Sequence, residues 1–282
     1  MKKQSTGIME RIRTVYYKLT ETERKVADYV LANADKVQYM SIAELAQACS
    51  VADSSVFRFC RSLDMPGFTG FRLELAKNLA VSGKRKSQDC DDSVRGRYMK
   101  TSQLVQQALD ETFQLIDEDA VKQAVTMMEQ ADRVLVMGSG GGSITAEVFV
   151  HMFSGICNKC KSISDPHMQY MEVASMTPKD VLIVLTRTGA TINGINLLRH
   201  ARECGVPTVL VTRFPQSPAA EFADVILRTG YDESPLEFGT VPGRLATLMV
   251  AEMLLSEYYS RNRAECEKYS RRMVESISSQ HV

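Results

Sequence analysis

The segment Arg133-Val-Leu-Val-Met-Gly-Ser-Gly-Gly-Gly-Ser143 joins an apolar run to a glycine-rich turn, and a helical pattern follows as far as Ile156. The same order recurs downstream, where the apolar run Val181–Leu185 precedes a hydroxyl-rich turn, Thr186–Thr191, and a helical stretch to Cys204. Short apolar strands that alternate with helices predict a parallel sheet covered by helices on both faces.

The surrounding segments extend this pattern. Further strands are expected at Lys161–Ser164, Pro207–Val211 and Asp224–Leu227, and further helices at Val121–Gln130 and Leu245–Tyr259. The polar stretch 81–100 has almost no apolar periodicity, which is typical of a linker. We therefore expect a helical domain at 1–80, a linker at 81–100, an α/β domain at 101–262 and a helical tail at 263–282.

Charge divides the chain in the same way. Residues 1–86 carry 15 Lys and Arg against 9 Asp and Glu, whereas the remaining residues carry 19 against 25. A basic first module on an acidic remainder fits a polyanionic partner for the first module, because phosphates that are neutralised by basic side chains release counterions.

The basic module contains two short helical patterns joined by the turn Ser50-Val-Ala52. Ser41 is expected to begin the first helix, with Glu44 completing a capping box. The second helix is expected from Asp53, as its N-cap, to Leu63. Its apolar residues form one stripe, Val56, Phe59, Cys60 and Leu63. This arrangement is typical of a helix-turn-helix, whose second helix enters the major groove.

The opposite face of the second helix supplies the candidate DNA contacts, which are Ser54, Ser55, Arg58, Arg61 and Ser62. Hydroxyls near the start of such a helix can contact bases or phosphates, and arginines can pair with phosphate or read guanine. The alternative is a helical hairpin with a solvated basic face.

Residues 19–79 resemble the N-terminal domain of the RpiR family of bacterial transcriptional regulators. The matching segments are Leu19–Arg24, Val26–Val30, Ser41–Ala46, Ser55–Phe59 and Gly67–Phe71. The chain departs from the family at Asp64, where a glycine usually takes the left-handed position that ends the second helix. It also has Val51-Ala-Asp-Ser-Ser55 in place of the usual Ser-x-Ala-Thr, which leaves the base preference open. The resemblance implies double-stranded DNA as a partner.

Both turns of the α/β region suit an anion. Glycines let backbone N–H groups approach a phosphate, and each turn precedes a helix N-terminus with partial positive charge. The carboxyl ends of parallel strands share one edge of the sheet, so both turns are expected there. One alternative to an anion site is that both segments are ordinary tight turns between a strand and a helix. A nicotinamide dinucleotide site is another, because Gly138-x-Gly140-x-x-Ser143 approximates its fingerprint and Asp165 lies 22 residues further on.

Together the two turns resemble those of a sugar isomerase (SIS) domain, over roughly Val121 to Leu255. The second turn has Thr186 and Thr188 where that family typically has serines. The resemblance implies a flavodoxin-like five-stranded parallel sheet, a phosphosugar ligand and a dimer. The candidate ligand residues in the two turns are Ser139, Gly140, Ser143, Thr186, Arg187, Thr188, Gly189 and Thr191.

An aldose–ketose sugar-phosphate isomerase is the alternative function. That reaction needs a base beside C1 and C2 of the sugar, for which Glu237 and His167 are candidates. Neither lies in a recognisable catalytic motif, and the attached helical module favours a sensor. We therefore expect no enzymatic activity, no cofactor and no metal.

Seven cysteines stand at 49, 60, 90, 157, 160, 204 and 266. Their odd number, together with the lack of an apolar leader or a membrane-length segment, predicts reduced thiols in a cytoplasmic protein. Cys157-Asn-Lys-Cys160 is an isolated C-x-x-C. We expect two thiols at a helix-to-strand transition there rather than a metal site.

The sequence as a whole predicts a DNA-binding transcriptional regulator of a carbohydrate-metabolism operon, controlled by a phosphosugar or a phosphorylated sugar acid. As a homodimer or a dimer of dimers, it would present two recognition helices to an inverted-repeat operator. The bound ligand would shift the relative placement of those helices.

Overall fold

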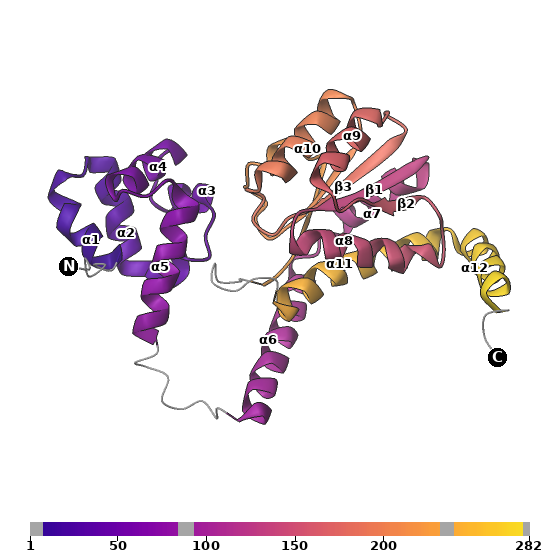
Figure 1. Cartoon of the computed structure of the whole chain (residues 1–282), viewed down its shortest axis with the longest axis horizontal. Coiled ribbons are helices and arrows are strands. Elements are labelled where there is room, and N and C mark those ends of the chain that lie inside the picture. Colours follow the sequence, from indigo (N-terminus) through magenta and orange to yellow (C-terminus); the bar gives the residue numbers. More distant parts are fainter. Residues whose placement is uncertain (1–7, 84–92, 232–239, 279–282) are drawn as a thin grey trace. The chain divides into compact units, whose positions relative to one another are not determined.

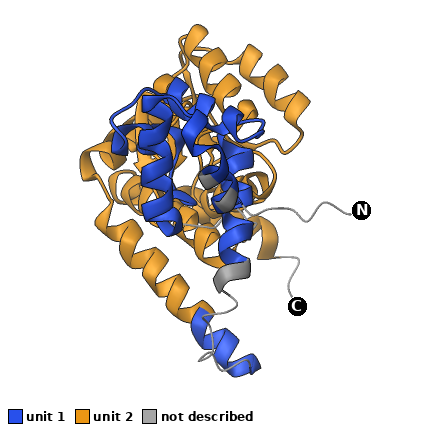
Figure 2. Ribbon diagram, turned by 90° about the vertical axis from the view of Figure 1, so that its left-hand side faces the viewer, with its two compact units in different colours: residues 1–100, 232–238 blue, residues 101–231, 239–282 orange. Residues whose placement is uncertain are grey.

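The computed structural model describes residues 8–83, 93–231 and 240–278 (Figure 1). The chain forms two compact units that divide between Lys100 and Thr101 (Figure 2). Each unit has an apolar core of its own.

The first unit is a helical bundle. Its elements are α1 (Ile8–Val15), the 3-10 helix η1 (Tyr16–Lys18), α2 (Glu21–Val37), α3 (Ile42–Ala48), α4 (Asp53–Ser62) and α5 (Phe68–Gly83). Completely buried side chains from four of these helices meet in the core, namely Val26, Val30, Leu45, Phe59 and Phe71. The helical first domain is therefore confirmed, and the apolar stripe of α4 is the face that packs inward.

The second unit is built on five parallel strands in the order β2-β1-β3-β4-β5. The strands are β1 (Arg133–Gly138), β2 (Cys160–Ser162), β3 (Asp180–Leu185), β4 (Thr208–Thr212) and β5 (Val225–Arg228). The helices are α6 (Val94–Gln114), which enters this unit at Thr101, α7 (Glu118–Gln130), α8 (Gly141–Ser154), α9 (Pro166–Ser175), α10 (Ile192–Glu203), α11 (Val241–Arg261) and α12 (Arg263–Ser278), with the 3-10 helix η2 (Ala220–Phe222) before β5. The predicted flavodoxin-like sheet is confirmed.

Alternate residues of each central strand serve opposite faces of the sheet. Val136 and Ile183 face a core formed with α7, α8 and α11. Leu135 and Leu182 face a second core formed with α9 and α10. The sheet is thus the middle of three layers, as Figure 1 shows. Every residue of β3 is buried, which explains its uninterrupted apolar run.

The predicted linker is helical at both ends. Residues 81–83 finish α5, and α6 begins at Val94, inside the expected linker. Residues 84–92 lie outside the described residues. Buried groups hold α6 to the second unit, because Ala108 packs against Tyr231 and Ala246, and the Thr112 hydroxyl accepts a hydrogen bond from the Gly230 N–H at 2.9 Å.

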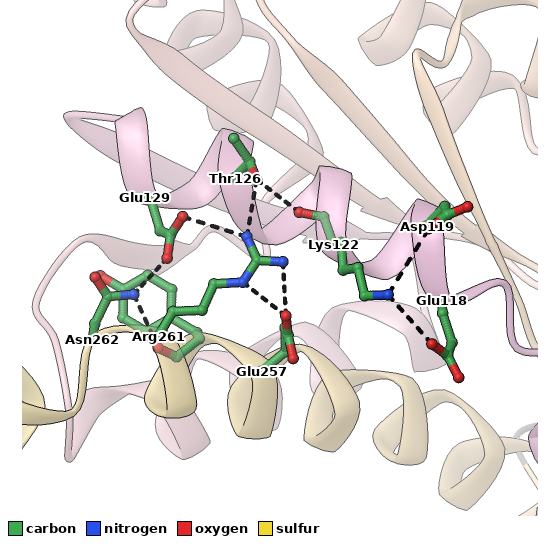
Figure 3. Close-up of polar contacts among 9 residues, drawn as sticks. Glu118, Asp119, Lys122, Thr126, Glu129, Glu257, Arg261 and Asn262 are labelled. Atoms are coloured by element: carbon green, nitrogen blue, oxygen red, sulfur yellow. Dashed lines mark hydrogen bonds and ion pairs between the residues drawn. The ribbon is translucent and has the colours of Figure 1, made fainter.

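Arg261 fixes the end of α11 against α7 (Figure 3). Its guanidinium donates to Glu257 at 2.7 Å and to the hydroxyl of Thr126 at 3.0 Å, and it lies 3.7 Å from the carboxylate of Glu129. The next residue, Asn262, donates to the other oxygen of Glu129 at 2.7 Å. These contacts set the point from which α12 departs.

No helix in the described ranges has both the length and the apolar character needed to cross a membrane.

Candidate functional site

Helix α3 and the turn that joins it to α4 are closed by hydrogen bonds at both ends of α3. Ser41 and Glu44 form the expected capping box at the start of α3, with bonds of 3.2 and 2.8 Å. At the end of α3, Ser50 adopts a φ of 53°, and the N–H groups of Ser50 and Val51 return to the carbonyls of the last turn. This is a Schellman motif made without glycine.

Asp53 is not the N-cap of α4, contrary to the sequence prediction. Ala52 takes the N-cap position, without a side-chain hydrogen bond, and Asp53 is the first helical residue. Because the turn after Ser50 is short, the helix begins one residue earlier than predicted, and the N-cap position falls on Ala52, whose methyl group cannot accept a hydrogen bond. The carboxylate of Asp53 still lies in the first turn, where the helix dipole favours negative charge.

The exposed face of α4 carries four of the five predicted DNA contacts, namely Ser54, Arg58, Arg61 and Ser62. Ser55 is different, because it is only 4% exposed and its hydroxyl accepts a hydrogen bond from Arg58 at 3.0 Å. It lies one helical turn before the core residue Phe59, so its small side chain packs inward. Ser55 therefore orients Arg58 and does not belong to the exposed face.

Buried Glu23 ties α4 to α2. It accepts hydrogen bonds from the Thr20 hydroxyl at 2.7 Å and from the Ser62 hydroxyl at 3.1 Å. Burial tends to raise the pKa of Glu23, but the bonds from Thr20 and Ser62 and the charge of Arg58 hold that pKa below its usual value. A charged Glu23 consequently fixes Ser62 and attracts Arg58 on the outer side of α4.

Sequence reasoning missed Phe57 on this face. Its ring is 42% exposed, and the guanidinium of Arg61 lies over it at 5.3 Å from the centroid. The signal was present in the sequence, because Phe57 is an aromatic residue outside the apolar stripe of its own helix. The outer face of α4 thus combines two arginines, two serines and one aromatic ring.

The two glycine-containing turns lie at the carboxyl edge of the sheet, after the neighbouring strands β1 and β3. In the first turn, Gly140 has a φ of 57°, and a Cβ on Gly138 would lie 2.6 Å from the backbone of Gly142. The chain can reverse this tightly only because both positions lack side chains. Ser143 donates to the carbonyl of Gly140 at 2.7 Å, which closes the turn.

The second turn is fixed to β4 and to the segment after it. Gly189 has a φ of 59°, and a Cβ there would overlap Ser217. The carbonyl of Arg187 accepts bonds from the Thr212 hydroxyl and the Arg213 N–H, both at 3.1 Å. The hydroxyls of Thr186 and Thr191 lie 3.5 Å apart across the mouth of the turn. Its hydroxyl groups are therefore held by a rigid backbone.

A partly buried network of amide side chains joins the two turns. Asn193, in the first turn of α10, donates to the Ser139 hydroxyl at 2.9 Å and to the side-chain carbonyl of Gln169 at 2.8 Å. Gln169, which is completely buried in α9, donates to the carbonyls of Gly138 and Ile163 at 3.0 and 2.6 Å. Sequence reasoning missed both amides, although Asn193 follows the second turn by only two residues.

The helices that follow the two turns begin without side-chain caps. Neither Gly140, at the start of α8, nor Thr191, at the start of α10, supplies a capping bond. In contrast, the carboxylate of Asp165 caps α9 by accepting from the Met168 N–H at 2.8 Å. Uncapped helix N-termini attract anions. The cap also gives Asp165 a structural role, which argues against the dinucleotide alternative.

The structure describes only one of the two residues considered for an isomerase. His167 is an exposed residue in the first turn of α9. Glu237 lies outside the described residues.

Known proteins share both parts of the chain. Residues 6–82 match the helix-turn-helix domain of the rpiR family, and residues 127–257 match the SIS domain. The HTH-type transcriptional regulator HexR of Escherichia coli is 28% identical over 273 residues, which cover 96% of this chain and 94% of HexR. An uncharacterized HTH-type transcriptional regulator of Haemophilus influenzae is 28% identical over 258 residues, covering 89% of each chain.

A solved structure has the same fold over nearly the whole chain. NanR of Vibrio vulnificus, complexed with ManNAc-6P, superimposes with a TM-score of 0.87 at 22% identity, and the match covers 98% of this chain and 100% of that one. The fold and these matches define a transcriptional regulator in which a helix-turn-helix domain precedes a SIS domain. The chain thus combines a helix-turn-helix domain of the rpiR family with a SIS domain, and it is a regulator rather than an isomerase.

Proposed function

We propose that this regulator controls a carbohydrate-metabolism operon and that a phosphosugar or phosphorylated sugar acid, bound between the two turns of the SIS domain, sets its affinity for the operator. The carrying observation is the amide network, which holds Ser139 of the first turn to Asn193 beside the second. Two hydroxyl-rich turns that are fixed to one another form a single anion site rather than two separate bends.

The chemistry of the turns fits a phosphate ester. Ser139, Thr186, Thr188 and Thr191 supply hydroxyls, and the uncapped starts of α8 and α10 supply partial positive charge. Exposed Gly140 keeps the backbone of the first turn accessible, whereas buried Gly189 lets the second turn pack against Ser217. Arg187 provides a cation within the second turn. The structural neighbour NanR was solved with a phosphosugar, ManNAc-6P, which supports this ligand class.

For DNA, the exposed face of α4 is the expected contact surface. Ser54, near the start of the helix, would contact base edges, and Arg58, Arg61 and Ser62 would contact phosphates or guanine. A homodimer, or a dimer of dimers, would present two such helices to an inverted repeat with half-sites about one or two helical turns apart.

Fluorescence anisotropy tests the proposal. A duplex from upstream of the gene is titrated with the protein at stated salt, with and without a panel of sugar phosphates and phosphorylated sugar acids. We expect salt-sensitive, sequence-specific binding that one compound shifts by roughly 5–150-fold, the usual range of allosteric coupling. Specific binding that no phosphorylated compound changes would contradict the ligand assignment.

Thr188 separates the ligand site from DNA binding. Thr188→Phe should leave operator binding intact and remove the ligand effect, because the ring would fill the space beside the second turn. Thr188→Ser is the matched control and should keep both functions, since it retains the hydroxyl that accepts from the Ala190 N–H at 3.3 Å. An unchanged ligand response in Thr188→Phe would overturn the site.

A further inference from the structure

Cys157 and Cys160 flank the connection between α8 and β2, at the helix-to-strand transition expected from the sequence. Cys160 is the first residue of β2 and pairs with Val134 of β1, and its side chain is nearly buried. Cys157 is partly exposed and packs at the margin of the same apolar core. Neither residue belongs to the DNA surface or to the two turns.

The two thiols interact directly. Cys157 packs against the apolar cluster that contains Cys160, three residues further along the chain. The neighbouring Cys160 thiol, as a donor to the Cys157 sulfur, holds the pKa of Cys157 well below its ordinary value despite the opposing effect of burial, and the backbone N–H groups of Lys159 and Cys160 and the ammonium of Lys159 act in the same direction. The same contact raises the pKa of Cys160. The pair therefore combines a partly exposed thiol whose pKa is lowered with a buried thiol whose pKa is raised.

This pair is not part of a metal site in the described part of the chain, where no three His, Cys, Asp or Glu side chains group suitably. Reduced, vicinal thiols of unequal acidity are instead the arrangement that reacts with oxidants. The exposed thiolate attacks, and the neighbouring thiol resolves the product.

The C-terminal helix α12 contacts the connection between α8 and β2. Ser270 of α12 donates to the carbonyl of Gly155 at 2.7 Å. Cys266 of α12 is 1% exposed and packs in the apolar cluster that contains Cys160 and Tyr258. A change in the 155–160 backbone would therefore act directly on the packing of α12.

We propose that Cys157 and Cys160 form a dithiol that hydroperoxides oxidise to a disulfide, and that this disulfide loosens α12. The Cys157 thiolate attacks one oxygen of the peroxide, which breaks the O–O bond, forms a sulfenic acid and releases hydroxide. The Cys160 sulfur then displaces hydroxide from the sulfenic acid to form the S–S bond, and its proton leaves in water. Overall, two thiols are oxidised, and one hydrogen peroxide is reduced to two waters.

The disulfide alters the loop because it shortens the distance between the sulfurs. An S–S bond of ~2.05 Å is shorter than any non-bonded contact between two sulfurs, so we expect the backbone between residues 155 and 160 to adjust when the bond forms. The contacts of that segment with Ser270 and Cys266 are then weakened.

Thiol chemistry on the full-length protein tests the site. At pH 7, we expect Cys157 to be alkylated ~10-fold faster than Cys204, a control cysteine of the same intermediate exposure that stands far from any other cysteine in the sequence. After hydrogen peroxide and trypsin, cleavage at Lys159 should leave two peptides joined by a Cys157–Cys160 disulfide. Cys157 reacting no faster than Cys204, or a disulfide involving other cysteines, would overturn the proposal.

Isosteric variants assign the roles. Cys160→Ser should stop at a Cys157 sulfenic acid that dimedone captures, whereas Cys157→Ser should give neither product and Cys204→Ser should behave as wild type.

Hydrogen exchange measures how readily the backbone of α12 opens. We expect faster exchange across residues 263–278 after oxidation, reversed by dithiothreitol and absent in Cys157→Ser. A disulfide that forms without altering exchange in α12 would refute the coupling.

Discussion

Asn193 directs the hydroxyl of Ser139 by occupying its acceptor position. One amide hydrogen of Asn193 goes to Ser139 and the other to Gln169. Since Ser139 already accepts a hydrogen bond, its own O–H hydrogen points elsewhere, and a phosphate between the two turns is the partner that we propose for it. Asn193 is thus a positioning residue that acts through Ser139.

Asn193→Leu keeps the shape of this side chain but removes both donors. We expect roughly tenfold weaker binding of the phosphosugar by calorimetry, since a misdirected hydrogen bond to a charged group costs about 1.5–3 kcal/mol at most. In a Ser139→Ala background, the same substitution should have little further effect. Asn196→Leu, one helical turn later, is the control, because Asn196 contacts Arg199 instead. Equal losses in both backgrounds would show that Asn193 acts only through stability.

Two residues with left-handed backbone conformation, Ser50 and Asp64, differ in how well the sequence predicts them. Asp64 adopts a φ of 58° at the end of α4, as expected from the glycine that usually stands there. Ser50 adopts the same conformation after α3, without any sequence signal. Left-handed backbone is predictable where a pattern demands glycine, but a serine held there by packed neighbours resembles any other turn residue.

An ion pair at the amino edge of the sheet joins the starts of β1 and β3. Arg133 donates to the two carboxylate oxygens of Asp180 at 3.0 and 2.9 Å, and the Thr177 N–H donates to one of them at 2.8 Å. The bond from Arg133 outweighs burial and, together with the Thr177 N–H, holds the pKa of Asp180 below its usual value of 3.8. The two central strands therefore begin in register at a charged contact.

Stability should depend on acidity through this pair. Because the pKa of Asp180 is lower in the folded state than in the unfolded chain, its contribution is present above pH ~4 and is lost as pH falls through the folded pKa. Asp180→Asn should lower the free energy of unfolding by about 1–3 kcal/mol at pH 7, and by much less near pH 3.

Urea unfolding followed by circular dichroism measures this difference, since the chain has no tryptophan. The control is Asp132→Asn, at the exposed position beside Arg133. A difference between wild type and Asp180→Asn that stays constant from pH 7 to pH 3 would refute the charge-based account.

The molecule as a whole combines a basic helical unit with an α/β unit, and each unit has its own proposed binding surface. Arg58 belongs to the first surface, where Ser55 orients its guanidinium. Arg58→Ala should weaken operator binding and reduce the slope of log affinity against log salt by about 1 per contacted phosphate, with phosphosugar affinity unchanged.

Anisotropy titrations over a range of salt concentrations measure both quantities. Arg271→Ala is the matched control, because it removes the same charge from an exposed side chain of α12 in the other unit. Parallel loss of DNA and ligand binding in Arg58→Ala would mean that the substitution acts through the fold.

The amino-acid sequence by itself determined the two units, the parallel sheet, the inward stripe of α4 and the two anion-suited turns. These features depend on local periodicity and glycine placement, which are read directly along the chain. Only the tertiary structure showed that Ser55 is buried, that Asp53 is not a cap, and that Gln169 and Asn193 join the turns. The partners concerned stand up to 54 residues apart, and their meeting depends on how helices pack across the sheet.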